Sequence, residues 1–157
     1  MGAALTQHPD LMQAVVSHVG IYDMLRVELD PNGSFNVTEF GSVKDADQFQ
    51  ALFAYSPYHH VAKGVRYPAV LFLSAEQDDR VDPMHARKMA AALQAANASD
   101  RRLLFRLLEQ SGHSGADRVQ AQVDEAADRL SFLFQEVGKP QVRLGLGIQG
   151  SWPGTGN

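Results

Sequence analysis

An aspartate and a histidine follow two successive strand-like runs of the sequence, where a hydrolase would keep its catalytic acid and base. Asp78 opens the tripeptide Asp-Asp-Arg after one run, and His113 lies in Ser-Gly-His-Ser-Gly after the next. In a Ser-His-Asp triad the acid orients the imidazole, and the histidine takes the proton from the serine hydroxyl. These two residues therefore indicate hydrolysis of esters or amides.

The nucleophile of such a triad is the open question. No G-x-S-x-G elbow occurs in the 157 residues, and without cysteine any nucleophile must be an oxygen. Ser17 near the first strand-like run and Ser114 beside the histidine are candidates, although neither lies in a pattern typical of a strained elbow. Two alternatives follow: an esterase that uses one of these hydroxyls, or a catalytically silent fragment that self-assembles.

Apolar runs alternate with segments of helical period, which is typical of parallel β-α-β units. The sequence predicts strands over residues 14–19, 67–74 and 102–108, helices over 45–54, 83–98 and 119–137, a helical end within residues 1–8, and a loop over 29–38. The unbroken apolar run over 67–74 indicates a strand buried on both faces. Asp82 is expected to cap the helix over 83–98, with Pro83 in its first turn.

The order of these elements predicts the fold and the place of the site. In a parallel sheet, active residues gather in the loops at the carboxyl ends of the strands, where both Asp78 and His113 fall. The acid precedes the histidine by one helix and one strand, as in α/β-hydrolases. We therefore expect a partial α/β-hydrolase-like three-layer sandwich, in which a short parallel sheet is flanked by helices.

Six segments of the chain resemble, in the same order, the C-terminal half of the catalytic domain of bacterial prolyl oligopeptidases. They are Gln7–Leu11, Ala14–Leu25, Thr38–Gly41, Tyr55–His59, Asp78–Val81 and Ser111–His113. The resemblance covers about residues 1–137. It implies an α/β-hydrolase fold, hydrolysis of small ester or peptide substrates, and a chain that begins just after the nucleophile serine.

The resemblance also implies roles for single residues. Asp78 matches the triad acid, His113 matches the general base, and Arg80 matches a ligand of the substrate carbonyl. The apolar wall of the family's primary specificity pocket is matched by Ile21, Phe40 and Val81.

One departure concerns proline. The family stacks the substrate proline on a tryptophan, and that position here is Asn36, with Phe35 beside it. A preference for proline is therefore not implied.

Composition argues against other classes of function. The net charge is -4 and the 14 basic residues are scattered, so a nucleic-acid partner is not expected. No apolar run of about 20 residues and no leader are present, which predicts neither a membrane protein nor an exported one, but a soluble cytoplasmic protein. The six histidines lack the spacing of zinc ligands, and no metal or organic cofactor is implied.

The chain is predicted to form one domain over residues 1–137, followed by a glycine-rich tail over 138–157. If the strands pair in chain order, the strand over 14–19 lies at an edge of the sheet. It carries no lysine, proline or charge that would protect this edge, so we expect a homo-oligomer joined through it. The alternative partner for the edge is the chain's own segment 141–149.

Overall fold

Three parallel strands form the centre of the computed structural model, which describes residues 1–109, 111–113 and 119–138. They are β1 (Ala14–His18), β2 (Ala69–Ala75) and β3 (Leu103–Leu108), and they lie in the order β1-β2-β3. The three predicted strands are confirmed, with bounds that agree within two residues. Within the described part of the chain β1 pairs with β2 alone, so the prediction that β1 lies at an edge is also confirmed.

Five helices and four short 3-10 turns connect and flank the strands in the described part. The helices are α1 (Gly2–Gln7), α2 (Val37–Phe40), α3 (Ala46–Tyr55), α4 (Met84–Ala96) and α5 (Val119–Val137). The turns are η1 (Pro9–Leu11), η2 (Val27–Leu29), η3 (Gly33–Asn36) and η4 (Pro57–His60). The predicted helices over 45–54, 83–98 and 119–137 are confirmed as α3, α4 and α5, and the helical end within residues 1–8 as α1.

Side-chain caps explain where two of the helices begin. The Asp45 carboxylate accepts hydrogen bonds from the backbone N–H groups of Asp47 and Gln48, at 3.0 and 2.9 Å, and so caps α3. In α4 the position before the helix is taken by Pro83 rather than by Asp82. Asp82 nevertheless accepts the N–H of Met84 at 2.7 Å, so its carboxylate still satisfies a free donor of the first turn.

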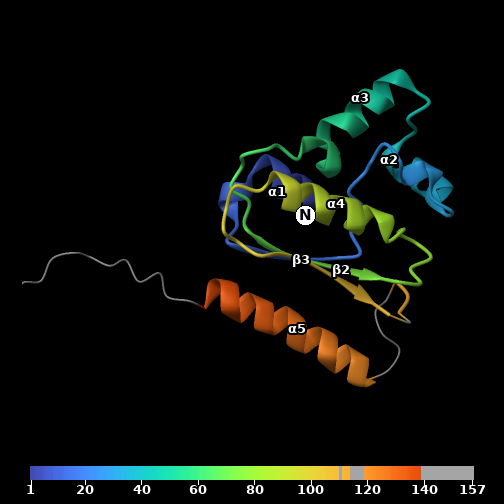
Figure 1. Ribbon diagram of the computed structural model, residues 1–157. Helices are drawn as coiled ribbons and strands as arrows, with labels where there is room; N and C mark the ends of the chain where they lie inside the picture. The colour runs from blue at the N-terminus through green and yellow to red at the C-terminus, as the bar shows by residue number, and fades with distance from the viewer. Residues whose placement is uncertain (110, 114–118, 139–157) are drawn as a thin grey trace, which may run out of the picture.

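The sheet is the middle layer of three. Helix α5 covers one face of the sheet, and α4 covers the other together with α1 (Figure 1). Helices α2 and α3 lie beyond α4, away from the sheet (Figure 1). The three-layer arrangement predicted from the order of the elements is therefore present.

Strand β2 organises the hydrophobic core on both faces. All seven of its residues are buried, as predicted. Val70 and Phe72 pack with Met89 and Leu93 of α4, whereas the alternate residues Ala69, Leu71 and Leu73 pack against Phe132 of α5. Burial of each large apolar side chain contributes about 1.5–3 kcal/mol, so this strand is the main anchor of the described fold.

Helix α5 confirms the predicted bounds, but its apolar side faces away from the sheet. The exposed apolar side chains are those of Val119, Val123, Leu130, Phe134 and Val137. At about 100° per residue they fall within about 60° of one side of the helix. We call these five residues the α5 stripe.

Paired carboxylates explain how α5 is turned. Glu125 and Glu136 are buried on the sheet side. Glu125 lies 3.6 Å from His18 Nε2, and Glu136 lies 3.7 and 3.5 Å from the guanidinium groups of Arg101 and Arg102. Because a buried charge is costly unless it is paired, the two arginines hold Glu136 inward, and Arg129 of α5 itself pairs with Glu125 at 3.7 Å.

The loop predicted over residues 29–38 is only partly correct. It contains η3 and the start of α2, because Gly33 N–H donates to Asp30 O at 2.8 Å and Phe35 N–H donates to Asn32 O at 3.2 Å. A Cβ atom on Gly33 would lie 2.0 Å from Val27 O, so the close approach of the two turns requires glycine. The sequence Pro-Asn-Gly marks turns that continue into short helices.

The predicted tail over 138–157 lies outside the described residues, except for Gly138. The segment 141–149, the alternative partner of β1, lies entirely outside them. Among the described residues no helix combines the length and the apolar character needed to cross a membrane.

Val19, directly after β1, has a φ of 44°, the one non-glycine residue of the described chain with a positive φ. This region costs an ordinary L-residue about 1–2 kcal/mol, and asparagine tolerates it better. We expect Val19→Asn to raise the free energy of unfolding by about 1 kcal/mol, measured by urea denaturation. The matched control is Val61→Asn at a half-buried valine with a φ of -69°. A loss of stability at Val19 as large as that at Val61 would contradict the role of strain.

Candidate active site

Asp78 and His113 are in direct contact. His113 Nδ1 lies 3.0 Å from both carboxylate oxygens of Asp78. The Asp78 side chain is 0% exposed and the His113 side chain is 28% exposed. With Nδ1 facing the acid, Nε2 is the nitrogen that remains for proton transfer. The structure thus brings together the predicted acid and base.

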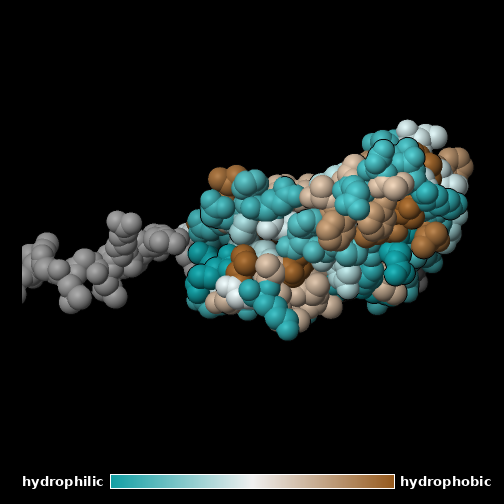
Figure 2. Space-filling model, turned by 90° about the horizontal axis from the view of Figure 1, so that it is seen from above, coloured by the Kyte–Doolittle hydropathy of each residue, from teal (hydrophilic) through white to brown (hydrophobic). Residues whose placement is uncertain are grey.

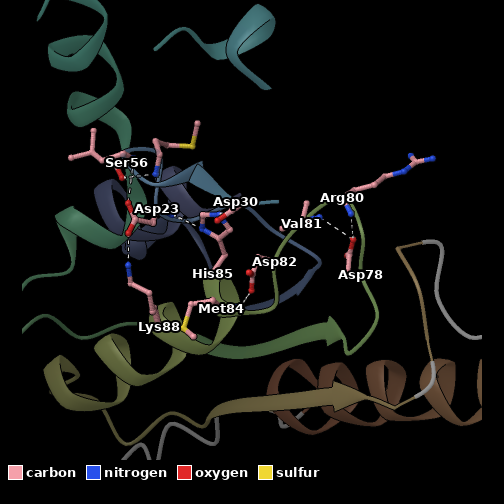
Figure 3. Close-up of polar contacts among 12 residues, drawn as sticks. Asp23, Asp30, Ser56, Asp78, Arg80, Val81, Asp82, Met84, His85 and Lys88 are labelled. Atoms are coloured by element: carbon pink, nitrogen blue, oxygen red, sulfur yellow. Dashed lines mark hydrogen bonds and ion pairs between the residues drawn. The ribbon is translucent and has the colours of Figure 1, made fainter. Parts of the chain in front are cut away.

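The turn after β2 fixes the Asp78 carboxylate. Asp78 Oδ1 accepts hydrogen bonds from the backbone N–H groups of Arg80 and Val81, both at 2.9 Å (Figure 3). The turn therefore orients the Asp78 carboxylate toward His113.

Backbone hydrogen bonds join the Asp78 and His113 loops beyond the ends of the strands. Glu76 N–H donates to Leu108 O and Gln77 N–H donates to Ser111 O, both at 3.0 Å. The pairing of β2 with β3 thus continues toward the site. The distance between acid and base is set by this pairing, as the placement at neighbouring strand ends predicts.

A cavity of about 400 Å³ lies beside the acid. Its lining consists of Asn32, Phe35, Asn36, Asp79 and Arg80. A second hollow of about 230 Å³ shares the lining residues Asn32, Asp79 and Arg80 with this cavity. Asp78 also lines the second hollow. The cavity therefore combines an aromatic ring, two amides, a carboxylate and a guanidinium, and adjoins a hollow that Asp78 lines.

Arg80 belongs to this cavity. It is exposed, and its side chain extends away from the Asp78 carboxylate (Figure 3). Within the described residues no ion pair joins it to Asp79 or Asp82, the two pairings that an ordinary loop arginine would favour. The guanidinium is therefore placed where a ligand in the cavity can meet it.

The three residues expected to form an apolar wall lie in different surroundings. Ile21 and Phe40 are half-buried and pack against a cluster of Met24, Val27 and Leu52. Val81 is half-buried in the turn that holds Asp78. The lining of the 400 Å³ cavity includes none of the three, so the structure brings Ile21 and Phe40 together but leaves Val81 apart from them.

Ser17, one of the two candidate nucleophiles, is engaged elsewhere. Its residue is 7% exposed, and its hydroxyl lies 2.6 Å from the Tyr22 hydroxyl. Burial raises the pKa of Tyr22 from 10.0 to about 12, and the hydrogen bond from Ser17 opposes part of this rise. The other candidate, Ser114, lies outside the described residues.

The raised pKa of Tyr22 predicts a loss of stability at alkaline pH. The folded chain holds the phenol proton up to about pH 12, whereas the unfolded chain releases it near pH 10. The folded state therefore binds more protons between these values, and the free energy of unfolding falls by about 2–3 kcal/mol as the pH rises through them. Urea denaturation of wild type and Tyr22→Phe at several pH values measures this effect. Equal slopes in the two proteins would contradict it.

Comparison with known proteins identifies the family. Residues 1–140 match the profile of the Prolyl oligopeptidase family. The chain belongs to this family. A prolyl endopeptidase of Elizabethkingia miricola is 36% identical over 139 residues, which are 88% of this chain and 20% of the relative. A prolyl endopeptidase of Dictyostelium discoideum is 38% identical over 136 residues, 85% of this chain and 18% of the relative.

The fold agrees with that of solved members of the prolyl oligopeptidase family. A chain from a structural and mechanistic study of two prolyl endopeptidases superposes with a TM-score of 0.84 at 47% identity, and the match covers 86% of this chain and 20% of that one. The resemblance noted in the six sequence segments is therefore confirmed, as is the partial α/β-hydrolase fold. The chain spans about a fifth of the length of these relatives.

A second group of polar side chains was not predicted from the sequence. Asp23, Asp30, Ser56, His85 and Lys88 gather near the start of α4, on the opposite side of it from β3 (Figure 3). The one available signal is the position of His85, four residues before the buried Met89 on the core side of α4, where an apolar residue is expected. No group of three metal-binding side chains occurs in the part of the chain that the structure describes.

Proposed function

We propose that this member of the prolyl oligopeptidase family acts as a serine-type hydrolase on esters or small peptide and amide substrates, with Asp78 as the acid and His113 as the base. The contact of both Asp78 oxygens with His113 Nδ1 carries this proposal. Two relatives that are 36% and 38% identical to this chain are prolyl endopeptidases, and this supports the reaction class.

The arrangement suits proton transfer in both halves of an acyl transfer. His113 Nε2 takes the proton of a serine hydroxyl as the oxygen attacks the substrate carbonyl, and then returns that proton to the leaving amine or alcohol. Asp78 remains ionised and stabilises the imidazolium that forms between the two steps. The buried side chain of Asp78 strengthens this interaction because water does not screen it.

Arg80 and the cavity are the proposed substrate site. The exposed guanidinium of Arg80 is a donor for a substrate carbonyl or carboxylate, and Phe35 offers an aromatic surface. Ile21, Phe40 and Val81 remain the proposed apolar wall, which requires a substrate that extends past the turn at Asp78. Asn36 occupies the position of the family's tryptophan, so the proposed substrates carry no requirement for proline.

The proposed nucleophile is a serine hydroxyl that reaches His113 Nε2. Ser17 suits this role poorly, because its hydroxyl is buried and already bonded to Tyr22. Activation of a serine needs an unoccupied hydroxyl within hydrogen-bond reach of the base. Covalent labelling of the reactive serine therefore identifies the nucleophile.

Fluorophosphonate labelling followed by peptide mass spectrometry tests the proposal. We expect one modified serine in the wild type, and loss of that label in His113→Ala. His8→Ala, at an exposed histidine that ends α1, is the matched control and should label as the wild type does. Labelling of no serine would overturn the proposed function and favour the silent fragment, whereas a label that persists in His113→Ala would overturn the role of His113 as the base.

We also propose that copies of the chain associate through the free edge of β1. The carbonyl of Gln13 and the N–H of Val19 bond to β2, so the backbone groups of the even-numbered residues between them point away from it. Within the described residues these groups have no strand partner, and they lie at an edge that no charged or proline residue protects. The C-terminal part of the α5 stripe is close by, since Gln13 donates to Glu136 O at 2.8 Å.

Light scattering coupled to gel filtration tests this association. The wild type is expected to elute as a dimer or larger species at micromolar concentration. Val16→Pro, which removes one of the outward N–H groups of β1, should shift the population toward monomer, whereas Gln120→Glu on α5 should not. A monomeric wild type would refute the association. The face over α1, α3 and α4 carries only separate hydrophobic patches within a mostly hydrophilic surface (Figure 2), and is less suited to this role.

A further inference from the structure

His85, in the first turn of α4, has both ring nitrogens engaged while being 4% exposed. Its Nδ1 accepts the backbone N–H of Asp23 at 3.1 Å. Its Nε2 lies 2.8 Å from Asp30 Oδ2. A backbone N–H can only donate, so Nδ1 is the acceptor of the Asp23 bond. The ring proton therefore resides on Nε2 and donates to Asp30. The hydrogen bonds thus determine one tautomer of the ring.

These two bonds join segments that are far apart in sequence. Asp23 and Asp30 belong to the segment that follows β1, whereas α4 begins directly after the loop that contains Asp78 and Arg80. The segment continues into Asn32, whose side chain donates to the backbone carbonyl of Asp79. His85 therefore fastens the segment to α4 at one end, and Asn32 fastens it to the catalytic loop at the other.

The segment forms one wall of the 400 Å³ cavity. Asn32, Phe35 and Asn36 line the cavity from this side, and Asp79 and Arg80 line it from the other. Asp30 also lines the adjoining 230 Å³ hollow. Its backbone carbonyl accepts the N–H of Gly33, which begins η3 and so leads into the lining residues. The position of the wall thus depends on where Asp30 is held.

A second contact holds the same segment from α4. Lys88, three residues after His85, forms an ion pair with the buried Asp23 carboxylate and lies 4.3 Å from the centre of the Tyr58 ring. His59 lies 3.9 Å from Asp23 as well. These contacts hold the start of the segment at Asp23. Among the described hydrogen bonds, the one from His85 to Asp30 is the bond from α4 that reaches the middle of the segment (Figure 3).

We propose that His85 is a positioning residue, whose hydrogen bond to Asp30 sets the wall of the cavity opposite Arg80 and thereby tunes substrate affinity. The inference rests on the proposed function for the identity of the ligand as an ester or peptide. The placement of the wall itself does not depend on it. His85 touches neither Asp78 nor His113 in the described hydrogen bonds, so it acts on binding rather than on proton transfer.

Two substitutions separate the two bonds of His85. His85→Asn places an amide near the position of Nδ1, where it retains an acceptor for the Asp23 N–H but does not reach Asp30. Asp30→Ala removes the same bond from its other side, and Asp30→Asn keeps an acceptor oxygen for Nε2–H. His8→Asn is the control for a change of histidine at an exposed position. Thermal unfolding verifies that each variant is folded, and Asp30→Ala still tests the loss of the bond if His85→Asn does not fold.

The first measurement is NMR of the backbone and side-chain amides in the absence of substrate. We expect His85→Asn and Asp30→Ala to shift the signals of the Asn32 side-chain amide and the Arg80 N–H, with Asp30→Asn and His8→Asn close to wild type. Unchanged Asn32 and Arg80 signals in both His85→Asn and Asp30→Ala would overturn the inference. This result does not depend on turnover, so it is separable from failure of the proposed function, which shows as absence of labelling in the wild type.

The second measurement is steady-state kinetics on a chromogenic peptide ester. Loss of one hydrogen bond to a charged acceptor is expected to raise KM about tenfold in His85→Asn and Asp30→Ala, while kcat stays within about twofold. Asp30→Asn should restore most of the affinity. A fall in kcat with an unchanged KM would overturn the inference, because it would place His85 in the chemical step.

Discussion

Asp78→Asn is expected to lower the rate of hydrolysis by about 10⁴-fold while leaving the fold intact. The asparagine oxygen still accepts the N–H groups of Arg80 and Val81, so the turn after β2 is retained. With its oxygen on these N–H groups, the amide turns its NH2 group toward His113 Nδ1. Because NH2 is a donor, it favours the tautomer in which Nδ1 accepts and the proton lies on Nε2. That tautomer cannot take a proton from a serine.

Kinetics on an activated ester, together with urea denaturation, measure both sides of this prediction. Glu76→Gln is the matched control, since Glu76 is an exposed carboxylate of the same loop that lines neither hollow of the proposed substrate site. We expect Glu76→Gln to retain a rate within about tenfold of wild type. Equal losses in the two variants would show that the charge of the loop, and not the contact with His113, supports the reaction.

Lys88→Met is expected to lower the free energy of unfolding by about 3 kcal/mol. The substitution preserves the length of the side chain but leaves the Asp23 carboxylate, which is 3% exposed, without its cation. Removal of one partner of a buried ion pair is costly because the other charge stays desolvated. The effect should lie at the low end of the usual range, since 30% of the Lys88 side chain is exposed.

A double-variant cycle in urea tests this explanation. Asp23→Asn combined with Lys88→Met removes the charge as well as its partner, and should recover most of the stability lost in Lys88→Met. Arg87→Met, at the exposed neighbour on α4, is the control for loss of a cation from this helix. If the double variant is less stable than Lys88→Met by the full cost of Asp23→Asn, the two residues are not coupled and the explanation fails.

The strands and the acid–histidine pair were predictable because each depends on a local pattern. The apolar run of β2 has the composition of a strand buried on both faces, and the core requires it to be central. Asp78 and His113 follow neighbouring strands, and parallel pairing brings such positions together without any knowledge of the rest of the chain.

The orientation of α5 and the surroundings of His85 were not predictable, because both depend on contacts with residues from other elements. The apolar period of α5 gives its length but not the side that meets the sheet, which is decided by partners of Glu125 and Glu136 from other elements. His85 meets Asp23 and Asp30, 62 and 55 residues away along the chain. No shared motif and no strand pairing places these three residues together, so the single sequence carries no signal for their contacts.

The two backbone hydrogen bonds beyond the strand ends, from Glu76 and Gln77, have a consequence for how the acid–base pair fails on heating. A site held by loops alone is lost through local opening, well below the temperature at which the fold itself is lost. Here the two loops that carry the pair are joined by amides that extend the ladder of β2 and β3, so the hydrogen exchange of these amides should be nearly as slow as that of the strands. The lifetime of the acid–base pair is then the lifetime of the sheet.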